Sequence, residues 1–161
     1  MKKYFIVFAT LIFLLGSSCE EKINIEKEKE AIKAVFEADK TAYFNQDYNA
    51  MGELWIKEPS SIKIFMSAKG LTKYEGWENI NASQKKETED NSWDRKQMKA
   101  TFSNYNINLI DDESASVVCE TSWEGIMGGD TLNIKQNRIV VLKKVDGKWK
   151  YSLHSIYNIP L

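Results

Sequence analysis

Apolar residues in the first third of the chain recur at helical spacing. From Ile32 to Tyr43 they fall at steps of three and four residues, which places them on one stripe of a helix that ends near Asn45. Asp39 lies on the same stripe, so we expect its carboxyl group to face the core. Asp47 is then well placed to cap the amino end of a second, short helix.

After the second helix, the period of the pattern changes to two. Residues 61–67 (SIKIFMS) alternate as a strand does, and residues 68–76 are typical of a hairpin or loop. A third, more polar helix is predicted to begin at Trp77. The second half of the chain consists of strands and turns, and Asp146-Gly147 is its strongest hairpin signal. Helices followed by antiparallel strands predict an α+β domain with one strongly bent sheet.

The first strand of the second half changes the face of its apolar residues partway along. A straight strand would therefore expose half of them to water. A β-bulge near Ser103 and Asn104 resolves the conflict, because an extra residue re-aims the side chains and bends the sheet. The residues concerned are Met98, Ala100 and Phe102 on one parity and Tyr105, Ile107 and Leu109 on the other.

The last strand holds His154, the one histidine of the sequence. Counting by twos from Trp149 gives a largely aromatic and apolar inward face of Tyr151, Leu153, Ser155 and Tyr157. His154 falls on the opposite parity. It is therefore predicted to point away from the interior, unless a bulge in this strand reverses its side.

The amino-terminal segment MKKYFIVFATLIFLLGSS has the layout of an export signal, with two lysines, a short apolar run and then small residues. Cys19 follows directly, which resembles the lipobox of bacterial lipoproteins, whose cysteine is acylated. We predict a signal peptide over residues 1–18, a tether from the acylated Cys19 over residues 19–25 and one domain over residues 26–161. The resemblance implies a lipid-anchored protein in the envelope of a Gram-negative bacterium, on the periplasmic or surface side of the outer membrane. The alternatives are a secreted or periplasmic protein and a protein anchored by a single membrane-spanning segment.

The full sequence is nearly neutral, with 22 basic and 23 acidic side chains. This balance argues against a nucleic-acid partner, which would favour a basic face. One histidine and, beyond Cys19, only Cys119 cannot supply a zinc or haem site, and no run resembles an acidic calcium loop. We therefore expect no metal and no cofactor. Cys119 is interpreted as a small buried side chain on a strand.

Three stretches, in this order and spacing, resemble the nuclear transport factor 2-like (NTF2-like) superfamily, which includes the SnoaL-like and ketosteroid-isomerase-like proteins. They are AIKAVFEADKTAYFNQDYNAMGELW in the first two helices, YEGWENI at the third and VVLKKVDGKWKYSLHSIY in the closing hairpin. The resemblance implies a cone in which a curved antiparallel sheet wraps about three helices and opens onto a mostly apolar pocket. It also implies a homodimer that forms through the outer face of the sheet.

No complete catalytic set of the superfamily can be assembled from this chain. One histidine cannot form the histidine pair of the dehydratases, and no acidic pair is placed around an arginine as in the epoxide hydrolases. Asp39 and Tyr43 lie one helical turn apart, but not in the arrangement of the isomerases. Asp39 is the sharpest candidate for a general base, because burial raises the pKa of a carboxyl group; the alternative is that it bonds a tyrosine or a backbone group. Tyr43 and His154 are weaker catalytic candidates.

Aromatic residues are the second functional signal, with five tryptophans and seven tyrosines in the sequence. Those that could line the cone and bind a ligand are Tyr43, Trp55, Trp77, Trp123, Trp149, Tyr151 and Tyr157, and the alternative for most of them is core packing. Two functions stay open. The first is a non-catalytic module that binds a small apolar ligand or a partner. The second is an isomerase, cyclase or dehydratase that uses a pocket carboxylate as general base on a small hydrophobic substrate.

These two functions predict different interiors for the cone. An apolar cavity into which two or more polar side chains converge within hydrogen-bond reach would favour the enzyme. A cone filled by its own aromatic residues would favour the module.

Overall fold

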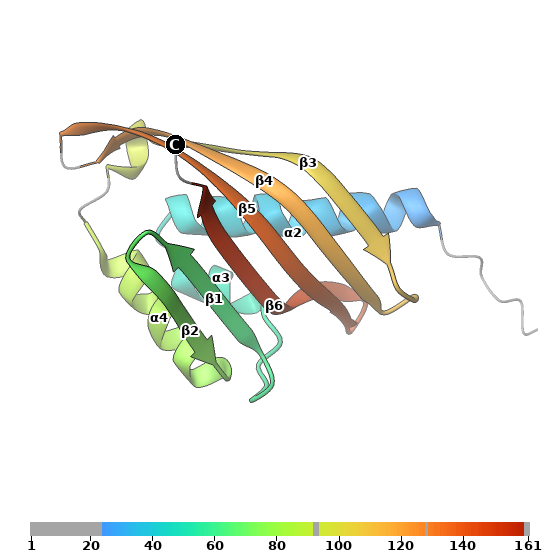
Figure 1. Cartoon of the computed structure of the whole chain (residues 1–161). Helices are drawn as coiled ribbons and strands as arrows, with labels where there is room; N and C mark the ends of the chain where they lie inside the picture. The colour runs from blue at the N-terminus through green and yellow to red at the C-terminus, as the bar shows by residue number, and fades with distance from the viewer. Residues whose placement is uncertain (1–23, 92–93, 128, 160–161) are drawn as a thin grey trace, which may run out of the picture.

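Three helices lie on the inner face of a six-stranded sheet in the computed structural model, which describes residues 24–91, 94–127 and 129–159 (Figure 1). The helices are α2 (Ile25–Phe44), α3 (Tyr48–Glu53) and α4 (Trp77–Glu89), with a short 3-10 helix η1 (Arg95–Gln97). The strands are β1 (Ile62–Ser67), β2 (Gly70–Glu75), β3 (Lys99–Leu109), β4 (Ser114–Met127), β5 (Asp130–Val145) and β6 (Lys148–Ile159). The predicted α+β class is confirmed.

The predicted signal peptide over residues 1–18, Cys19 and most of the predicted tether lie outside the described residues. The last two residues of that tether are described: Asn24 caps α2 by accepting a hydrogen bond from the Lys27 backbone N–H, and Ile25 begins the helix. Within the described residues, no helix is both long and apolar enough to span a membrane. The same residues contain no group of three or more His, Cys, Asp or Glu side chains that could hold a metal ion.

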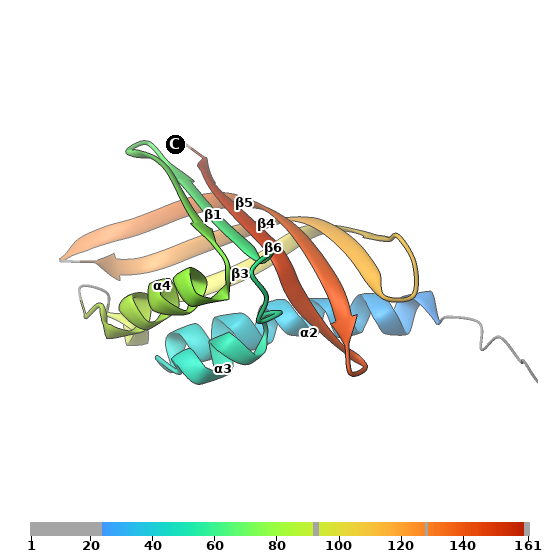
Figure 2. The ribbon, with the colours of Figure 1, turned by 90° about the horizontal axis from the view of Figure 1, so that it is seen from below.

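The sheet has the order β2-β1-β6-β5-β4-β3, and it curves around α2 (Figure 2). All neighbouring strands are antiparallel except β1 and β6, which are parallel. The prediction of a wholly antiparallel sheet is therefore wrong at this one pair. The β1–β2 hairpin adds to the free edge of the last strand, and the direction of such a long-range pairing leaves no mark on the local pattern.

Two bulges shape the sheet. The register of β3 against β4 shifts between Ser103 and Asn106, and Asn104 has a φ of 53°, so the bulge predicted from the parity change is confirmed. A second irregularity lies where β6 meets β5, because Val141 pairs with Leu153 while Leu142 pairs with Tyr151. Ser152 is therefore the extra residue, and every later side chain of β6 changes face.

The core lies between the apolar stripe of α2 and the inner face of the long strands. Phe36 is fully buried and meets the rings of Phe102, Tyr105 and Tyr151 edge to face, with centroids 5.5 to 5.8 Å apart. Cys119 is 1% exposed on β4, as predicted. Asp47 caps α3 by accepting from the Ala50 backbone N–H at 2.9 Å, which confirms its predicted role.

Candidate functional site

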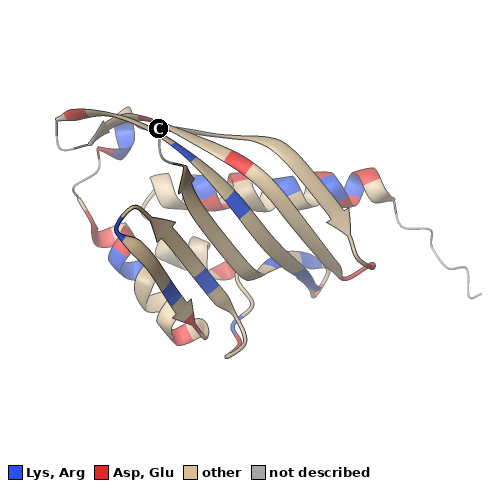
Figure 3. Cartoon of the chain, viewed as in Figure 1, with Lys and Arg blue, Asp and Glu red and all other residues tan. Residues whose placement is uncertain are grey.

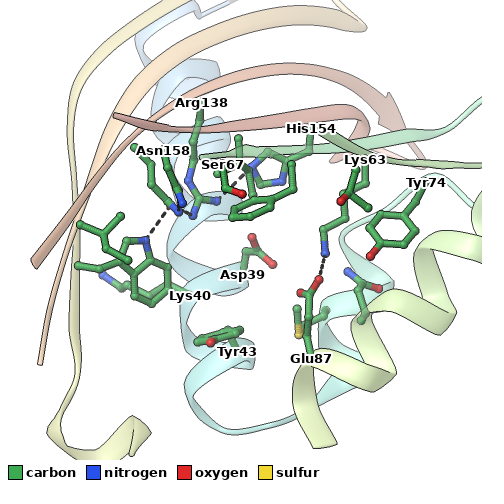
Figure 4. A pocket seen from close by; sticks show the side chains of 18 of the residues that line it. Asp39, Lys40, Tyr43, Lys63, Ser67, Tyr74, Glu87, Arg138, His154 and Asn158 are labelled. Atoms are coloured by element: carbon green, nitrogen blue, oxygen red, sulfur yellow. Dashed lines mark hydrogen bonds and ion pairs between the residues drawn. The ribbon is translucent and has the colours of Figure 1, made fainter. Parts of the chain in front are cut away.

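A cavity of about 760 Å³ opens between the inner face of the sheet and the helices α2 and α4 (Figure 4). This volume lies within the range of pockets that hold small molecules. Much of its wall is aromatic or aliphatic, from Tyr43, Met51, Trp55, Phe65, Phe102, Trp123, Ile134 and Ile156. The cone is therefore hollow at this end and is not filled by its own aromatic residues.

Asp39 faces the cavity from α2, on the inward stripe where its spacing predicts it (Figure 4). Burial raises the pKa of its carboxyl group; the positive charges of Arg138 and Lys63 oppose that effect, and Glu87 adds to it. Among the described residues, no hydrogen-bond donor reaches this carboxyl group. The expected alternative, a bond to a tyrosine or to the backbone, is thus not what the structure shows.

His154 points into the cavity, so the prediction that it faces away is wrong. It is 3% exposed and lines the cavity wall. Because Ser152 is an extra residue in β6, the side chains that follow it lie on the opposite face from the one predicted by counting in twos from Trp149. Its Nε2 lies 3.1 Å from Nη1 of Arg138. A guanidinium group can only donate, so Nε2 accepts and the imidazole is neutral with its proton on Nδ1. Burial, Arg138 and Lys63 all lower the pKa of His154, in agreement with a neutral ring.

Arg138 is the cation at the centre of this wall, and it is 5% exposed. Its Nη2 donates to Gln136 Oε1 at 3.3 Å, and its guanidinium group lies 5.1 Å from the centroid of the Phe102 ring. Its Nε is buried without a hydrogen-bond partner. No carboxylate among the described residues forms an ion pair with it.

Gln136 holds the neighbouring polar groups in place. Its Oε1 accepts from Trp123 Nε1 at 2.8 Å, and its Nε2 donates to Asn158 Oδ1 at 2.8 Å. These bonds fix the indole of Trp123 and the amide of Asn158 at the cavity wall. The orientation of both groups is therefore set before any ligand enters.

Lys63 occupies the opposite side of the cavity, on β1. Lysine side chains on strands are mostly solvated, but Lys63 is 7% exposed and lines the cavity. Its Nζ donates to Glu87 Oε1 at 2.6 Å, and Ser83 Oγ lies 3.5 Å away (Figure 4). This cation is neutralised by its own partner, in contrast to Arg138.

Three of the seven predicted aromatic ligand residues line the cavity. They are Tyr43, Trp55 and Trp123. The rings of Tyr43 and Trp123 meet edge to face at 5.5 Å, and the guanidinium group of Arg95 lies 5.0 Å from the centre of the Tyr43 ring. Burial raises the pKa of the Tyr43 phenol.

The other four predicted ligand residues lie outside the cavity lining. Tyr151 is fully buried in the core, and Trp149 donates from Nε1 to Glu28 Oε2 at 2.7 Å, near the start of α2. Trp77 packs against the core from the start of α4. Tyr157 follows the bulge of β6 and shares the outer face with its cross-strand partner Asn137. The inward face predicted from Trp149 therefore holds only as far as Tyr151.

Sequence reasoning missed the polar cavity residues on β5. Gln136 and Arg138 share the parity of Val140 and Leu142, which are buried. Continuing that count backward along the strand would have placed both side chains inside. A charged residue on the inward parity of a strand is thus a signal for a functional site.

No protein-family model matches the sequence, and no curated protein matches it. Solved structures do match its fold. A ketosteroid isomerase-like protein from Erwinia carotovora atroseptica superposes with a TM-score of 0.59 at 13% identity, over 82% of this chain and 96% of that one. An NTF2-like protein of unknown function from Shewanella oneidensis gives 0.60 at 17% identity, over 81% and 98%. The structure of LinA gives 0.67 at 14% identity, over 84% and 90%.

These similarities show the fold, a curved sheet around three helices. The chain has the NTF2-like fold that its sequence resembles. A fold of this kind carries many activities, so function has to be argued from the cavity itself.

Proposed function

We propose that this protein binds a small molecule with a largely apolar body in the cavity between α2, α4 and the sheet. The observation that carries the proposal is the open cavity of about 760 Å³, whose aromatic walls are interrupted by polar groups on separate elements. Asp39 comes from α2, Lys63 from β1, Arg138 from β5 and His154 from β6. Apolar walls supply affinity and a few placed polar groups supply orientation, which is how small-molecule sites are built.

A fluorescence titration tests this binding. We expect 3-phenylpropanamide, a neutral probe with an aromatic ring and a polar end, to cause a saturable change in tryptophan fluorescence. The amplitude should fall in Trp123→Phe, because Trp123 lines the cavity, and persist in the control Trp149→Phe, whose ring lies outside the lining. No saturable change in the parent protein with either this amide or the corresponding acid, 3-phenylpropanoate, or a response lost only in Trp149→Phe, would contradict the proposal.

A second candidate function is proton transfer on the bound molecule, with Asp39 as general base. A carboxyl group that faces an apolar cavity, has a raised pKa and has no hydrogen-bond donor among the described residues is suited to take a proton near neutral pH. Arg138 and Asn158, on the sheet side of the same cavity, could stabilise negative charge that develops on a substrate oxygen. The ketosteroid isomerase-like neighbour makes this class of chemistry a reasonable one to assay.

We propose further that two copies pair through the outer face of the sheet. Val118 and Ile139 are cross-strand partners there, exposed by 47% and 44%. Charged residues are sparse along the central strands and dense along α2 and α4 (Figure 3). The same face carries Ile62, Ile64, Met66, Val141, Leu153 and Tyr157. An exposed apolar patch of this kind is typical of an interface.

Sedimentation of the purified protein tests the dimer. We expect the parent chain to sediment as a dimer and Ile139→Glu as a monomer, because a charge in the middle of the patch would be buried without a partner. Ala82→Glu introduces the same charge on the exposed side of α4 and should leave the dimer intact. A monomeric parent chain, or a dimer that survives Ile139→Glu, would rule out this interface.

We also propose that the protein is exported and held in the cell envelope by a lipid on Cys19. The proposal rests on the amino-terminal sequence, which lies outside the described residues. Cells fed a labelled fatty acid should label the parent chain and not Cys19→Ala, and only the parent chain should fractionate with membranes. Equal recovery of both proteins in the soluble fraction would contradict the anchor.

A further inference from the structure

We propose that Arg138 is the anchor for a carboxylate on the bound molecule, so that the cavity selects small monocarboxylic acids with an apolar body. This inference rests on the proposed binding function and specifies the class of ligand. It is carried by the surroundings of one side chain, which differ from those of the other cations that line the cavity.

Arg138 is a buried cation whose hydrogen-bond partners are all neutral. A guanidinium group has five N–H donors, and here one meets His154 Nε2 and another meets Gln136 Oε1. Neither partner carries a negative charge. Arginine is almost never fully buried without a paired anion, because removing its charge from water is costly. The Arg138 guanidinium group therefore keeps N–H donors and an unpaired positive charge that can bind an anion.

The guanidinium group is held in one orientation. Its Cζ lies over the Phe102 ring, 5.1 Å from the centroid, and His154 and Gln136 accept hydrogen bonds from its two terminal nitrogens. A planar donor group that is already positioned matches the two oxygens of a carboxylate and loses little entropy when they bind. This geometry favours a carboxylate over a neutral carbonyl group.

The charge of the cavity favours a single negative charge. Lys63 is paired with Glu87 at 2.6 Å, and Lys40 is paired with Glu37. Lys69 also lines the cavity but is exposed to solvent, so Arg138 is the buried cation of the cavity that has no carboxylate partner among the described residues, and Asp39 lies in the same space. The two charges of a dianion such as a phosphate ester would be repelled by an ionised Asp39 carboxylate more strongly than the one charge of a monoanion. Burial raises the pKa of Asp39, so its carboxyl group is more readily protonated and can then lie beside a monoanion.

The residues next to Arg138 fit an apolar body behind the carboxylate. Ile156 of β6 pairs directly across from Arg138, and Ile134, which precedes Arg138 on β5, pairs with Trp123 of β4. All three line the cavity. A ligand whose charged end contacts Arg138 would therefore place its ring or chain against these side chains.

The test compares 3-phenylpropanoate with 3-phenylpropanamide, which have nearly the same size and differ in charge. We expect the parent protein to bind the acid about 10-fold or more tighter than the amide, since hydrogen bonds between charged groups are the stronger ones. In Arg138→Gln the affinity for the acid should fall to that for the amide, and the affinity for the amide should stay unchanged. Lys135→Gln, which removes a charge from the exposed outer side of the same strand, should alter neither.

Each outcome decides between the two proposals. If the parent protein binds the amide and shows no preference for the acid, or if Arg138→Gln leaves the preference intact, the carboxylate anchor is wrong while the binding function stands. If neither probe binds, the binding function itself is contradicted. Should Arg138→Gln fail to fold, Arg138→Lys serves instead: it keeps the charge but loses the planar donor pair, so the preference for the acid should be reduced and not abolished.

Discussion

Replacing Asp39 by Asn is expected to make the protein more stable than the parent chain at neutral pH. Burial raises the pKa of the Asp39 carboxyl group above its value in the unfolded chain, so ionisation of this group opposes folding. Asparagine has nearly the shape of the protonated carboxyl group and never ionises. The substitution therefore removes a cost that the parent protein carries.

The pH dependence of this effect has a definite sign. Below the pKa of the unfolded chain, Asp39 is protonated in both states and the two proteins should be equally stable. As pH rises through the unfolded pKa toward the raised folded pKa, the parent protein loses stability relative to Asp39→Asn, and the difference then stays constant. The difference between the two proteins isolates Asp39 from the other groups that titrate or carry charge nearby. These are Lys40, Tyr43, Lys63, Lys69, Tyr74, Glu87, Asp90, Arg138 and His154 in the cavity wall, and Tyr151 in the adjoining core.

Urea denaturation of both proteins at a series of pH values measures this difference. A stability gap that shrinks as pH rises, or a less stable Asp39→Asn protein at neutral pH, would show that Asp39 is a structural residue paired in the fold. A residue that lowers stability and faces a cavity is a candidate for function, because binding and catalytic sites often carry such costs. If the cavity also transfers protons, the more stable variant should lack that activity.

Gly125→Ala is expected to destabilise the fold by about 2 to 4 kcal/mol. Gly125 lies on β4 with a φ of +154°, and η1 packs against it. A Cβ at this position would lie 2.7 Å from the carbonyl oxygen of Gln97 and 2.9 Å from the Cα of Met98. These are backbone atoms, so they cannot turn aside as a long side chain could. The contact fixes the end of the sheet that carries Trp123.

Gly129→Ala is the matched control for this prediction. Gly129 also has a positive φ, of +94°, but nothing lies within 4 Å of the added Cβ. Its replacement should cost only the backbone strain, about 1 kcal/mol. The two variants are compared by chemical denaturation. Equal losses of stability would mean that the close approach of η1 to β4 does not constrain the fold.

Local patterns were sufficient to predict most of the elements. The stripe of α2, the Asp47 cap and the Asp146-Gly147 turn are each set by residues within a few positions of one another. The bulge at Asn104 could also be predicted, because a strand cannot bury two opposite parities without one. In each case the physical cause lies within the segment that shows the pattern.

The face of His154 could not be predicted in this way. The first half of β6 is bonded to the segment after α3: Tyr151 N–H donates to the Leu54 carbonyl, and Ile56 N–H donates to the Tyr151 carbonyl. The second half pairs with β1 instead. The bulge at Ser152 lies where β6 changes from the first partner to the second. The sequence of β6 alone contains no pattern that predicts this change of partner.

The inward face of β1 could not be predicted from its sequence, for a different reason. Ile62, Ile64 and Met66 share a parity that usually marks the buried side of a strand, yet Lys63 on the other parity is the buried residue. The rule fails because the inner face here lines a cavity with polar groups, while the outer face is apolar. Such an inversion is expected where one face binds a ligand and the other meets a partner, which are the two roles proposed for this sheet.

The most direct test of the central claim is a set of crystal structures of the protein soaked with a library of small fragments, both neutral and anionic. We expect fragments to bind in the cavity, with their apolar parts against Trp123 and Ile134 and their polar ends toward Arg138. Fragments found only outside the cavity, or a cavity closed by its own side chains in every structure, would contradict it.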